Sequence, residues 1–600
     1  MFSWTDRELN AEQEAAICTP GSVFLVACPG SGKTKTLTYK IAYELSRLES
    51  DRQFIVAITY THRAADEIQE RIESLGVDTS KLWIGTIHSF CIEWIIKPYA
   101  IYEPRLANGY RIIDLHEREK LLEDLCKPYK AQRISSYDCE YYFADEGYYL
   151  GCPDSGKHSS LHAILARYFE ALEANRQIDF ELILWYAYKL IERLPQISIL
   201  LSKLFSIVLV DEYQDTKQIQ YFIISSILRA GAGATRLFMV GDPNQAIYGT
   251  LGGYPIPISD LKLLSQIEIT ERTLSQNYRS SARIITYFEN FNVYNTSITP
   301  AGSDQHYPSL VTYDSTVTHD DLVEEIVRLI RYNVEIIGIL PHEVCVLAPQ
   351  WVHLASMTRR LVAGLPDYQF NGPGMVPFAR DIENFWYKVS RLALTEPSPG
   401  MYVRRLRWAG EVLSELKDVG VHVSAISPKE FLRRCNAIVI NEIDGLAFLK
   451  QFFDALLATL KIKLQDFSHL QEHYDAFFDA SERRIAKLEG EGVEAVRELA
   501  FFKKVFQNRG GITVSTIHGV KGAEYDVVIA FALLEGMVPH FSDMDGRVSA
   551  QKMLYVVGSR ARKNLHLFSE TGRKRGKYGH YEATEVLRAC KFNYDDATEL

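Results

Sequence analysis

A glycine-rich turn at residues 27–34 constrains the fold of this chain more than any other segment. It reads Ala-Cys-Pro-Gly-Ser-Gly-Lys-Thr, follows an apolar run at 21–27 and precedes a helical pattern at 36–48. Gly30 and Gly32 allow the backbone to fold around phosphate groups, so that its N–H groups point inward at the positive end of the next helix. A strand, a turn and a helix in this order predict a parallel α/β sheet.

The side chains of this turn predict a nucleotide phosphate site. Lys33 would reach the β- and γ-phosphates, and Thr34 would hold Mg²⁺ through its hydroxyl group. Ala27 stands where the usual pattern has glycine, and Ser31 and Lys35 complete the expected nucleotide contacts of the turn.

A second apolar run ends in the acidic residues that such a site needs. Residues 207–215 read Ile-Val-Leu-Val-Asp-Glu-Tyr-Gln-Asp, so carboxylates directly follow a buried-strand pattern. Asp211 would bind Mg²⁺, and Glu212 would polarise the attacking water. Together the two segments predict hydrolysis of a nucleoside triphosphate, without indicating what the energy is used for.

Strand and helix patterns divide the chain into two α/β lobes, each interrupted by a mainly helical insertion. Strand-like runs occur at 54–59, 205–210 and 237–240, and a second group occurs at 344–348, 512–516 and 527–533. The intervening segments have helical periodicity and lack such runs. The expected units are a first lobe at 1–90 and 198–270 with its insertion at 91–197, and a second lobe at 271–366 and 511–600 with its insertion at 367–510.

The charge balance limits the kinds of partner. The chain has 66 basic and 76 acidic residues, which gives a formal net charge of −10. This excludes a protein coated in positive charge for packaging nucleic acid, but it leaves room for a local basic groove. Nine cysteines in 600 residues suit a reducing cytoplasm, the expected compartment. No apolar signal segment is evident at the start, and the longest apolar stretch, at 197–210, is too interrupted for a membrane span.

A group of thiols and imidazoles in the first insertion makes a zinc site conceivable. It comprises Cys126, Cys139, Cys152, His158 and His162. However, no Cys-x-x-Cys pair occurs and the spacings match no common zinc module. We therefore favour ordinary thiols in a helical insertion.

A series of strings resembles the motifs of the UvrD/Rep/PcrA group of superfamily 1 DNA helicases. Asp-Glu-Tyr-Gln-Asp at 211–215 is the string at which the resemblance becomes specific. The others follow the family's order over nearly the whole chain, at 9–13, 59–65, 85–90, 240–249, 276–280, 516–528, 535–540 and 554–562. The resemblance implies an α/β fold of two RecA-like parallel-sheet lobes with helical insertions, in the family's 1A/1B/2A/2B arrangement.

For the ATP site, the resemblance implies roles for residues outside the glycine-rich turn. Gln13 would read the adenine, Tyr278 would stack on it, and Glu524 would contact the ribose. Arginines from the second lobe would reach across the cleft to the transferring phosphoryl group, as arginine fingers do. The residues expected to contact the γ-phosphate are Gln245, Arg279 and Arg560.

For single-stranded DNA, the resemblance implies contacts from both lobes. Binding of this kind needs aromatic platforms and basic groups along one path. Phe90 is expected equally as a DNA contact and as a core residue. The candidate DNA-contacting residues are Tyr60, His62, Arg63, His88, Phe90, Tyr248, Thr516 and His518.

Two positions depart from the family's pattern. The family has Trp-Arg after the Ile-Tyr-Gly of its motif III, and the tryptophan stacks on a base; this chain has Thr250 and Leu251 there. Because threonine cannot stack, weaker stepping or another base-contacting aromatic is implied. Lys35 stands where the family commonly has arginine.

The leading hypothesis is an ATP- and Mg²⁺-dependent enzyme that translocates 3′→5′ on single-stranded DNA and unwinds duplex DNA. The direction is implied by the resemblance. The alternative is a DNA-stimulated ATPase or a nucleotide or DNA sensor subunit that regulates a partner nuclease, with little unwinding of its own. In its compact size, this chain also resembles the helicase-like subunits of anti-phage systems such as the Gabija type. A P-loop enzyme unrelated to nucleic acid is a third possibility.

Overall fold

The computed structural model describes most of the chain. The described residues are 2–5, 7–113, 115–372, 377–378, 384–490, 496–506, 510–541, 543, 545–576 and 579–597, without the side chains of residues 115, 116, 250, 400, 487 and 504.

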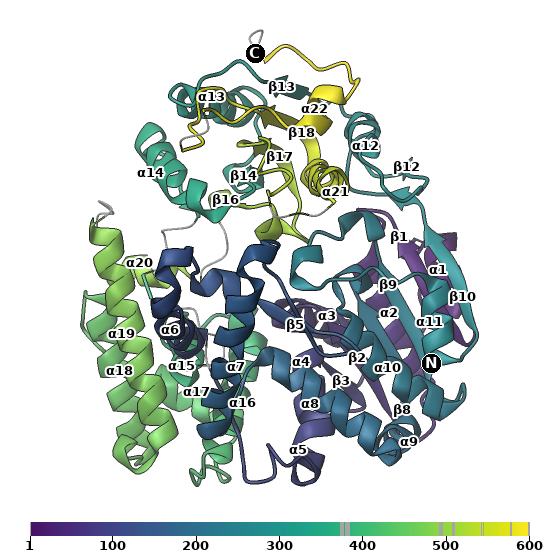
Figure 1. Cartoon of the computed structure of the whole chain (residues 1–600), viewed down its shortest axis with the longest axis vertical. Helices are drawn as coiled ribbons and strands as arrows, with labels where there is room; N and C mark the ends of the chain where they lie inside the picture. Colours follow the sequence, from purple (N-terminus) through teal and green to yellow (C-terminus); the bar gives the residue numbers. More distant parts are fainter. Residues whose placement is uncertain are drawn as a thin grey trace.

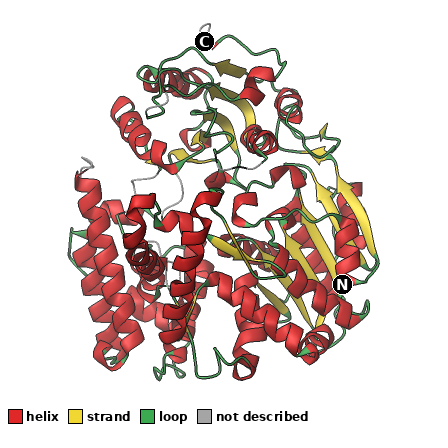
Figure 2. Ribbon diagram, viewed as in Figure 1, coloured by secondary structure: helices red, strands yellow, loops and turns green. Residues whose placement is uncertain are grey.

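The first lobe is built on a six-stranded parallel sheet (Figures 1 and 2). Its strand order is β10-β1-β9-β8-β2-β3, so β1 and β8 lie on either side of β9. All seven residues of β8 are buried, as expected for a central parallel strand covered on both faces. The bounds are β1 Ser22–Ala27, β2 Phe54–Thr59, β3 Leu82–Thr86, β8 Phe205–Asp211, β9 Arg236–Gly241 and β10 Ile269–Leu274.

Helices cover both faces of the first sheet. On one face, α1 (Ala11–Cys18), α2 (Lys33–Ser46) and α3 (His62–Ser74) contribute to a core with alternate residues of β1, β2 and β8. On the other face, α10 (Gln218–Gly231) and α11 (Ile258–Ser265) join a core that continues into the first insertion.

The second lobe repeats this architecture. Its six parallel strands follow the order β13-β18-β17-β14-β16-β15. One face packs on α12 (Ala282–Glu289) and α21 (Gly546–Gly558), and the other on α13 (Leu322–Arg331) and α14 (Leu354–Gly364). A short helix, α22 (Glu585–Ala589), follows the last strand. The strand bounds are β13 Val311–Asp314, β14 Val344–Ala348, β15 Phe370–Asn371, β16 Ile512–Thr516, β17 Tyr525–Ala530 and β18 Ala561–Phe568. The predicted α/β fold with two parallel sheets is therefore confirmed.

The segments between strands of each sheet are mainly helical. The first contains α4 (Ile87–Phe90), α5 (Lys97–Tyr99), α6 (Leu115–Cys126), α7 (His158–Ala174), α8 (Phe180–Arg193) and α9 (Pro195–Leu204). It also contains two small strand pairs that we did not predict, parallel β4–β7 (Arg111–Ile112 and Gln177–Ile178) and the antiparallel hairpin β5–β6 (Tyr141–Phe143 and Tyr148–Leu150).

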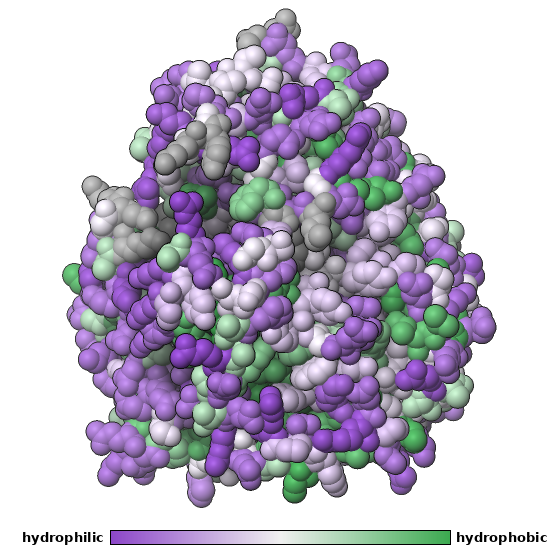
Figure 3. Space-filling view, viewed as in Figure 1, coloured by the Kyte–Doolittle hydropathy of each residue, from purple (hydrophilic) through white to green (hydrophobic). Residues whose placement is uncertain are grey.

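The second insertion is a separate helical body with an aromatic-rich core. Its helices are α15 (Phe385–Ala393), α16 (Tyr402–Asp418), α17 (Pro428–Asn436), α18 (Gly445–Leu460), α19 (Ser468–Gly490) and α20 (Leu499–Lys504). Figure 3 shows mostly hydrophilic residues on the surface of one face of the molecule, with hydrophobic residues in small separate groups.

The passage from the first lobe to the second lies slightly later than expected. The sequence pattern predicts this boundary at residue 270, whereas β10 continues to Leu274 and pairs with β1 along its whole length. The short pair β11–β12 (Gln276–Asn277 and Thr299–Pro300) then leads into the second lobe.

Two further expectations concern metal and membrane. In the cysteine and histidine group, Cys126 Sγ lies 3.6 Å from Cys139 Sγ, and the ring of His158 bonds the carbonyl of Cys152. These residues do not form a metal-ligating group among the described side chains. Within the described part of the chain, no helix is long and apolar enough to cross a membrane.

Candidate functional site

The glycine-rich turn has the backbone geometry that phosphate binding requires. Gly30 and Gly32 have φ values of +67° and +80°, and Gly32 is the N-cap of α2. The Ser31 hydroxyl closes the turn by donating to the carbonyl of Cys28 at 2.7 Å. A Cβ at Gly30 would lie 2.6 Å from Cβ of Arg279. Only glycine therefore fits at Gly30, both for its φ and for the approach of the second lobe.

Lys33 and Thr34 occupy the first turn of α2, directly after Gly32. Both are half-buried, and Lys33 Nζ lies 3.5 Å from the carbonyl of Ala27, the last residue of β1. Lys35 points away from the turn, because its ammonium donates to the carbonyl of Glu8 and lies 5.8 Å from the ring of Tyr39.

Gln13 links the first helix to the glycine-rich turn. It is 4% exposed and forms a capping box with Asn10, whose N–H donates to Gln13 Oε1 at 3.1 Å. Gln13 Nε2 donates to the carbonyl of Ser31 at 2.9 Å. Asn10 Nδ2 also donates to the hydroxyl of Tyr278 at 2.7 Å, and the side chain of Tyr278 is exposed. Asn10 thus connects the two predicted adenine contacts, Gln13 and Tyr278.

The acidic pair lies at the carboxyl end of β8. Burial, and then the charge of Glu212, raise the pKa of Asp211 to about 8, while Lys33 opposes the shift. Glu212 has the left-handed φ of +52°. Burial would raise its pKa, but Lys33 and Lys521 outweigh burial, so that the pKa of Glu212 lies below its usual value. Two carboxyl groups, of which Glu212 is the more readily ionised, therefore lie near Lys33 and offer the hard oxygen donors that a divalent cation site requires.

Gln245 and Arg560 meet across the boundary between the lobes. Gln245 follows β9 and donates to Asp242 Oδ2 at 2.8 Å, and it accepts a bond of 3.1 Å from Arg560. Arg560 is 1% exposed, and burial, followed by the charge of Arg279, lowers the pKa of its guanidinium. The hydrogen bonds that the structure gives this guanidinium go to neutral oxygens, those of Gln245, Val556, Ala523 and Ser559.

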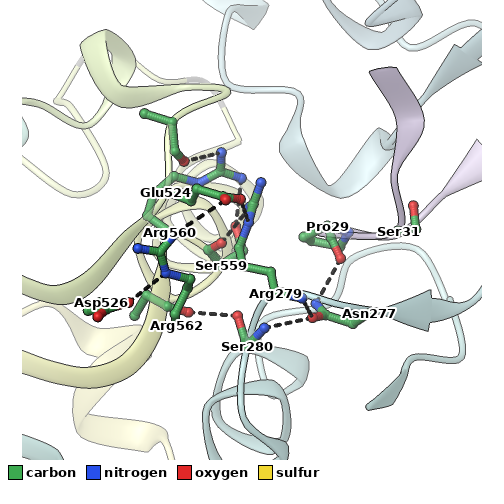
Figure 4. Close-up of polar contacts among 12 residues, drawn as sticks. Pro29, Ser31, Asn277, Arg279, Ser280, Glu524, Asp526, Ser559, Arg560 and Arg562 are labelled. Atoms are coloured by element: carbon green, nitrogen blue, oxygen red, sulfur yellow. Dashed lines mark hydrogen bonds and ion pairs between the residues drawn. The ribbon is translucent and has the colours of Figure 1, made fainter. Parts of the chain in front are cut away.

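Arg279 lies between the glycine-rich turn and the second lobe (Figure 4). Its Nε donates to Glu524 at 2.7 Å, and its Nη1 donates to the carbonyl of Ser559 at 2.9 Å. Asn277 anchors the same segment to the turn by donating to the carbonyl of Pro29 at 2.7 Å. The predicted γ-phosphate contact and the predicted ribose contact are therefore ion-paired with each other.

Lys521 and Asp215 form an inter-lobe ion pair that sequence reasoning missed. Lys521 Nζ lies 2.6 Å from Asp215 Oδ2 and donates to the carbonyl of Gln245 at 2.6 Å. The side chains are 9% and 1% exposed. Both residues fall inside the strings that we recognised, at 211–215 and 516–528, but a spacing of 306 residues gives no local signal that they pair.

Three of the predicted DNA contacts converge across the lobes. The rings of Tyr60 and Tyr248 stack with centroids 5.2 Å apart and an interplanar angle of 28°. The ring of Tyr248 also lies 5.4 Å from that of His518, and its hydroxyl donates to the His518 carbonyl at 3.4 Å. Lys521 lies 5.2 Å from the ring of Tyr248. The structure thus brings Tyr60, Tyr248 and His518 together.

The remaining DNA candidates have different environments. Thr61 caps α3 by accepting from the N–H of Ala64, which leaves His62 and Arg63 exposed on the first helical turn. His88 is half-buried against Phe180, and burial lowers its pKa to about 3. The Thr516 hydroxyl accepts from the N–H of Gly519 at 3.0 Å.

Of the two alternatives expected for Phe90, the structure supports the core residue and not the DNA contact. Its side chain is 1% exposed and belongs to the core of the first lobe, packed against Trp83 and Phe205. A buried ring has no face left for a base. Thr250 lies in the turn Gly249–Leu251, and its side chain falls outside the described residues, whereas Leu251 is 47% exposed.

In comparisons with known proteins, most of the chain matches one family. Residues 9–262 match the model of the UvrD/REP helicase N-terminal domain, and residues 461–571 match that of the UvrD-like helicase C-terminal domain. The ATP-dependent DNA helicase PcrA of Bacillus subtilis is 24% identical over 640 residues, which cover 93% of this chain and 82% of the relative. The PcrA proteins of Staphylococcus epidermidis and Staphylococcus aureus are 24% and 23% identical; they cover 94% of this chain and 84% and 83% of their own lengths.

Proposed function

Because the chain belongs to the UvrD/Rep/PcrA-like helicases, we propose that it is an ATP-dependent DNA helicase that translocates 3′→5′ on single-stranded DNA and unwinds duplex DNA. The geometry of the cleft between the lobes supports ATP binding, and the relatives are named ATP-dependent DNA helicases. The 3′→5′ direction is part of the proposal and follows the general behaviour of the family.

The environment of Arg560 is the observation that carries the proposal. The nearby carboxylates of Glu212, Asp242 and Glu524 favour the charge of this guanidinium, but burial and the charge of Arg279 outweigh them, and its hydrogen bonds go to neutral oxygens. The site is therefore suited to a ligand that brings negative charge into the cleft. The γ-phosphate of ATP, held from the other side by Lys33 and the N-terminus of α2, would supply that charge.

Glu212 is suited to act on the attacking water. Its lowered pKa keeps it ionised, so it can accept a proton as the water oxygen attacks the γ-phosphorus. The bond from the γ-phosphorus to the β–γ bridging oxygen then breaks, and ADP leaves with the electron pair. Lys33, Arg279 and Arg560 would offset the charge that develops on the transferring group.

Asp211 and Thr34 fit a Mg²⁺ ion. Both offer hard oxygen donors, and the raised pKa of Asp211 reports a buried carboxylate whose charge lacks compensation. When bound, Mg²⁺ would neutralise charge on the β- and γ-phosphate oxygens and lower the cost of ionising Asp211.

Contacts shared by the ATP cleft and the aromatic cluster would couple hydrolysis to movement. Lys521 bonds Asp215 and the carbonyl of Gln245, and it also lies over the ring of Tyr248. A change in lobe separation would therefore shift His518 and Lys521 of the second lobe relative to the rings of Tyr60 and Tyr248 on the first lobe. If bases stack on these rings, each ATP cycle would move the strand along the path.

Strand displacement tests this function directly. We expect ATP- and Mg²⁺-dependent unwinding of a duplex with a 3′ single-stranded tail, none with a 5′ tail, and loss of activity in Lys33→Ala. Lys81→Ala is the matched control, because Lys81 lies at the opposite edge of the same sheet, before β3. DNA-stimulated ATPase activity without displacement on either tail would contradict the helicase proposal. The comparisons do not favour the alternative of a subunit that regulates a nuclease.

A further inference from the structure

A cavity of about 470 Å³ lies at the carboxyl ends of β2, β3 and β8. In open parallel sheets, ligands bind at this edge, and the volume lies in the range of small-molecule sites. Aromatic rings reach the cavity from four separate segments of the chain. They are Tyr60 after β2, Tyr142 on β5, Phe180 at the start of α8 and Tyr248 after β9.

Tyr142 is the aromatic residue that the hairpin β5–β6 of the first insertion contributes. Side chains alternate along a strand, and Tyr141 and Phe143 face the core of the insertion. Tyr141 donates to Asp179 at 2.7 Å, and Phe143 stacks on Trp185 with centroids 4.6 Å apart. Tyr142 therefore points to the opposite side of the hairpin from these core contacts; both Tyr141 and Tyr142 line the cavity, and Tyr142 is the half-buried one of the two.

The ring of Tyr142 is held from two sides. It stacks on the ring of its cross-strand partner Tyr149, with centroids 5.8 Å apart and an interplanar angle of 18°. It also lies against Gly252, where a Cβ would be 2.9 Å from Cγ of Tyr142. The loop that carries Gly252 is fixed in turn, because Gly253 bridges to Lys217 and the N–H of Tyr254 donates to the Thr216 carbonyl.

The rim of the cavity continues into the predicted DNA path. The stacked rings of Tyr60 and Tyr248 line it, and His62 lines it from the exposed first turn of α3 beside Arg63. Aromatic faces next to exposed basic side chains are what an unstacked base and its phosphate backbone require. A planar ring held in place would bind a base with little loss of side-chain entropy.

We propose that Tyr142 is a base-stacking contact for single-stranded DNA, so that the hairpin of the first insertion forms part of the strand-binding path. This inference rests on the proposed function, since it assumes that the strand passes Tyr60 and Tyr248. Tyr142 would supply an aromatic platform beside Gly252, in the loop whose sequence has Thr250 in place of the family's tryptophan.

The test measures binding of single-stranded DNA that carries 2-aminopurine, whose fluorescence is quenched by stacking on an aromatic ring. Tyr142→Leu keeps apolar bulk but removes the ring. We expect about a tenfold higher Kd for single-stranded DNA and loss of the fluorescence quenching that stacking on this ring causes. Tyr142→Phe retains the ring, and we expect it to bind within about twofold of the wild type with normal quenching. Tyr137→Ala is the control, because this tyrosine of the same insertion is 85% exposed and lies outside the cavity.

The outcomes separate this inference from the proposed function. If the wild-type chain binds single-stranded DNA but Tyr142→Leu retains its affinity and quenching, the role of Tyr142 is overturned while the helicase proposal stands. An equal loss in Tyr142→Phe and Tyr142→Leu would also overturn stacking. If the wild-type chain does not bind single-stranded DNA, the proposed function fails, and this inference fails with it. Thermal melting of each variant shows whether the hairpin has kept its fold.

Discussion

Glu212 illustrates how one backbone position sets a chemical role. Its left-handed φ turns the chain directly after β8, and the nearby cations keep its carboxylate ionised. The substitution Glu212→Gln keeps the size and shape of the side chain but removes the carboxylate that would accept the proton. We expect ATP binding within about threefold of the wild type and a fall in kcat of at least about 100-fold. Binding of a fluorescent ATP analogue and phosphate release measure the two effects, and normal turnover would remove Glu212 from the mechanism.

ATP hydrolysis should depend more on the shape of the side chain at position 560 than on its positive charge. Lysine keeps the charge but cannot reproduce the planar fork that bonds Gln245 while facing a phosphate. We expect Arg560→Lys to lower the kcat of DNA-stimulated ATP hydrolysis by about 1,000-fold, which is the scale of effect that arginine fingers have. Arg562→Lys is the matched control, because Arg562 is already paired with Asp526, Glu343 and Glu524. A similar loss in both variants would argue against a specific role for Arg560.

Backbone conformation and residue position could be predicted where the requirement is local in sequence. The φ values at Gly30 and Gly32, and the position of Asp211 at the end of a buried strand, follow from short strings. Phe90 and Tyr142 could not be assigned in this way. Whether a ring lies in a core or on a cavity depends on the elements that pack beside it, and a one-residue shift along a strand reverses its side.

At the scale of elements, apolar strands were predictable and polar ones were not. The strands β2, β14 and β16 occupy the predicted residues. By contrast, β18 has the charged residues Arg562 and Lys563 near its start and carries buried Asn564 and His566, so its composition does not indicate a strand. Asn564 donates to Asn333, and His566 bonds Thr312 and Asn333. This polar network satisfies groups that a sequence pattern would place at the surface.

The ion pair of Lys521 and Asp215 joins the turn after β16 to the turn after β8, and it gives the lobes a fixed contact. Removing one partner leaves a buried charge uncompensated. We expect Lys521→Met to lower the thermal midpoint more than the double variant Asp215→Asn/Lys521→Met does. The double-variant cycle should give a coupling free energy of about 1–3 kcal/mol. Additive effects of the two single variants would show that the pair does not stabilise the lobe contact.

At the scale of the whole molecule, the sequence indicated two lobes but not how the insertions rest on them. Helix α16 of the second insertion is ion-paired with α3 of the first lobe, through Arg407 to Asp66 at 2.7 Å and Arg404 to Glu70 at 3.3 Å. Such contacts join surfaces that are far apart in sequence, and partly exposed ion pairs are individually weak. Periodicity within a segment contains no information about them.

Buried imidazoles link the stability of the whole molecule to pH. Burial lowers the pKa of both His566 and His473 to about 3, so both are neutral in the folded chain. In the unfolded chain they would bind protons below about pH 6.5, so the stability present above that pH is lost as pH falls toward 3. Each adds about 1.4 kcal/mol per pH unit to this loss. We expect the thermal midpoint to fall between pH 6.5 and 5, and less steeply in His566→Gln. The exposed control His306→Gln should follow the wild type; equal slopes in all three proteins would show that protonation of His566 does not contribute.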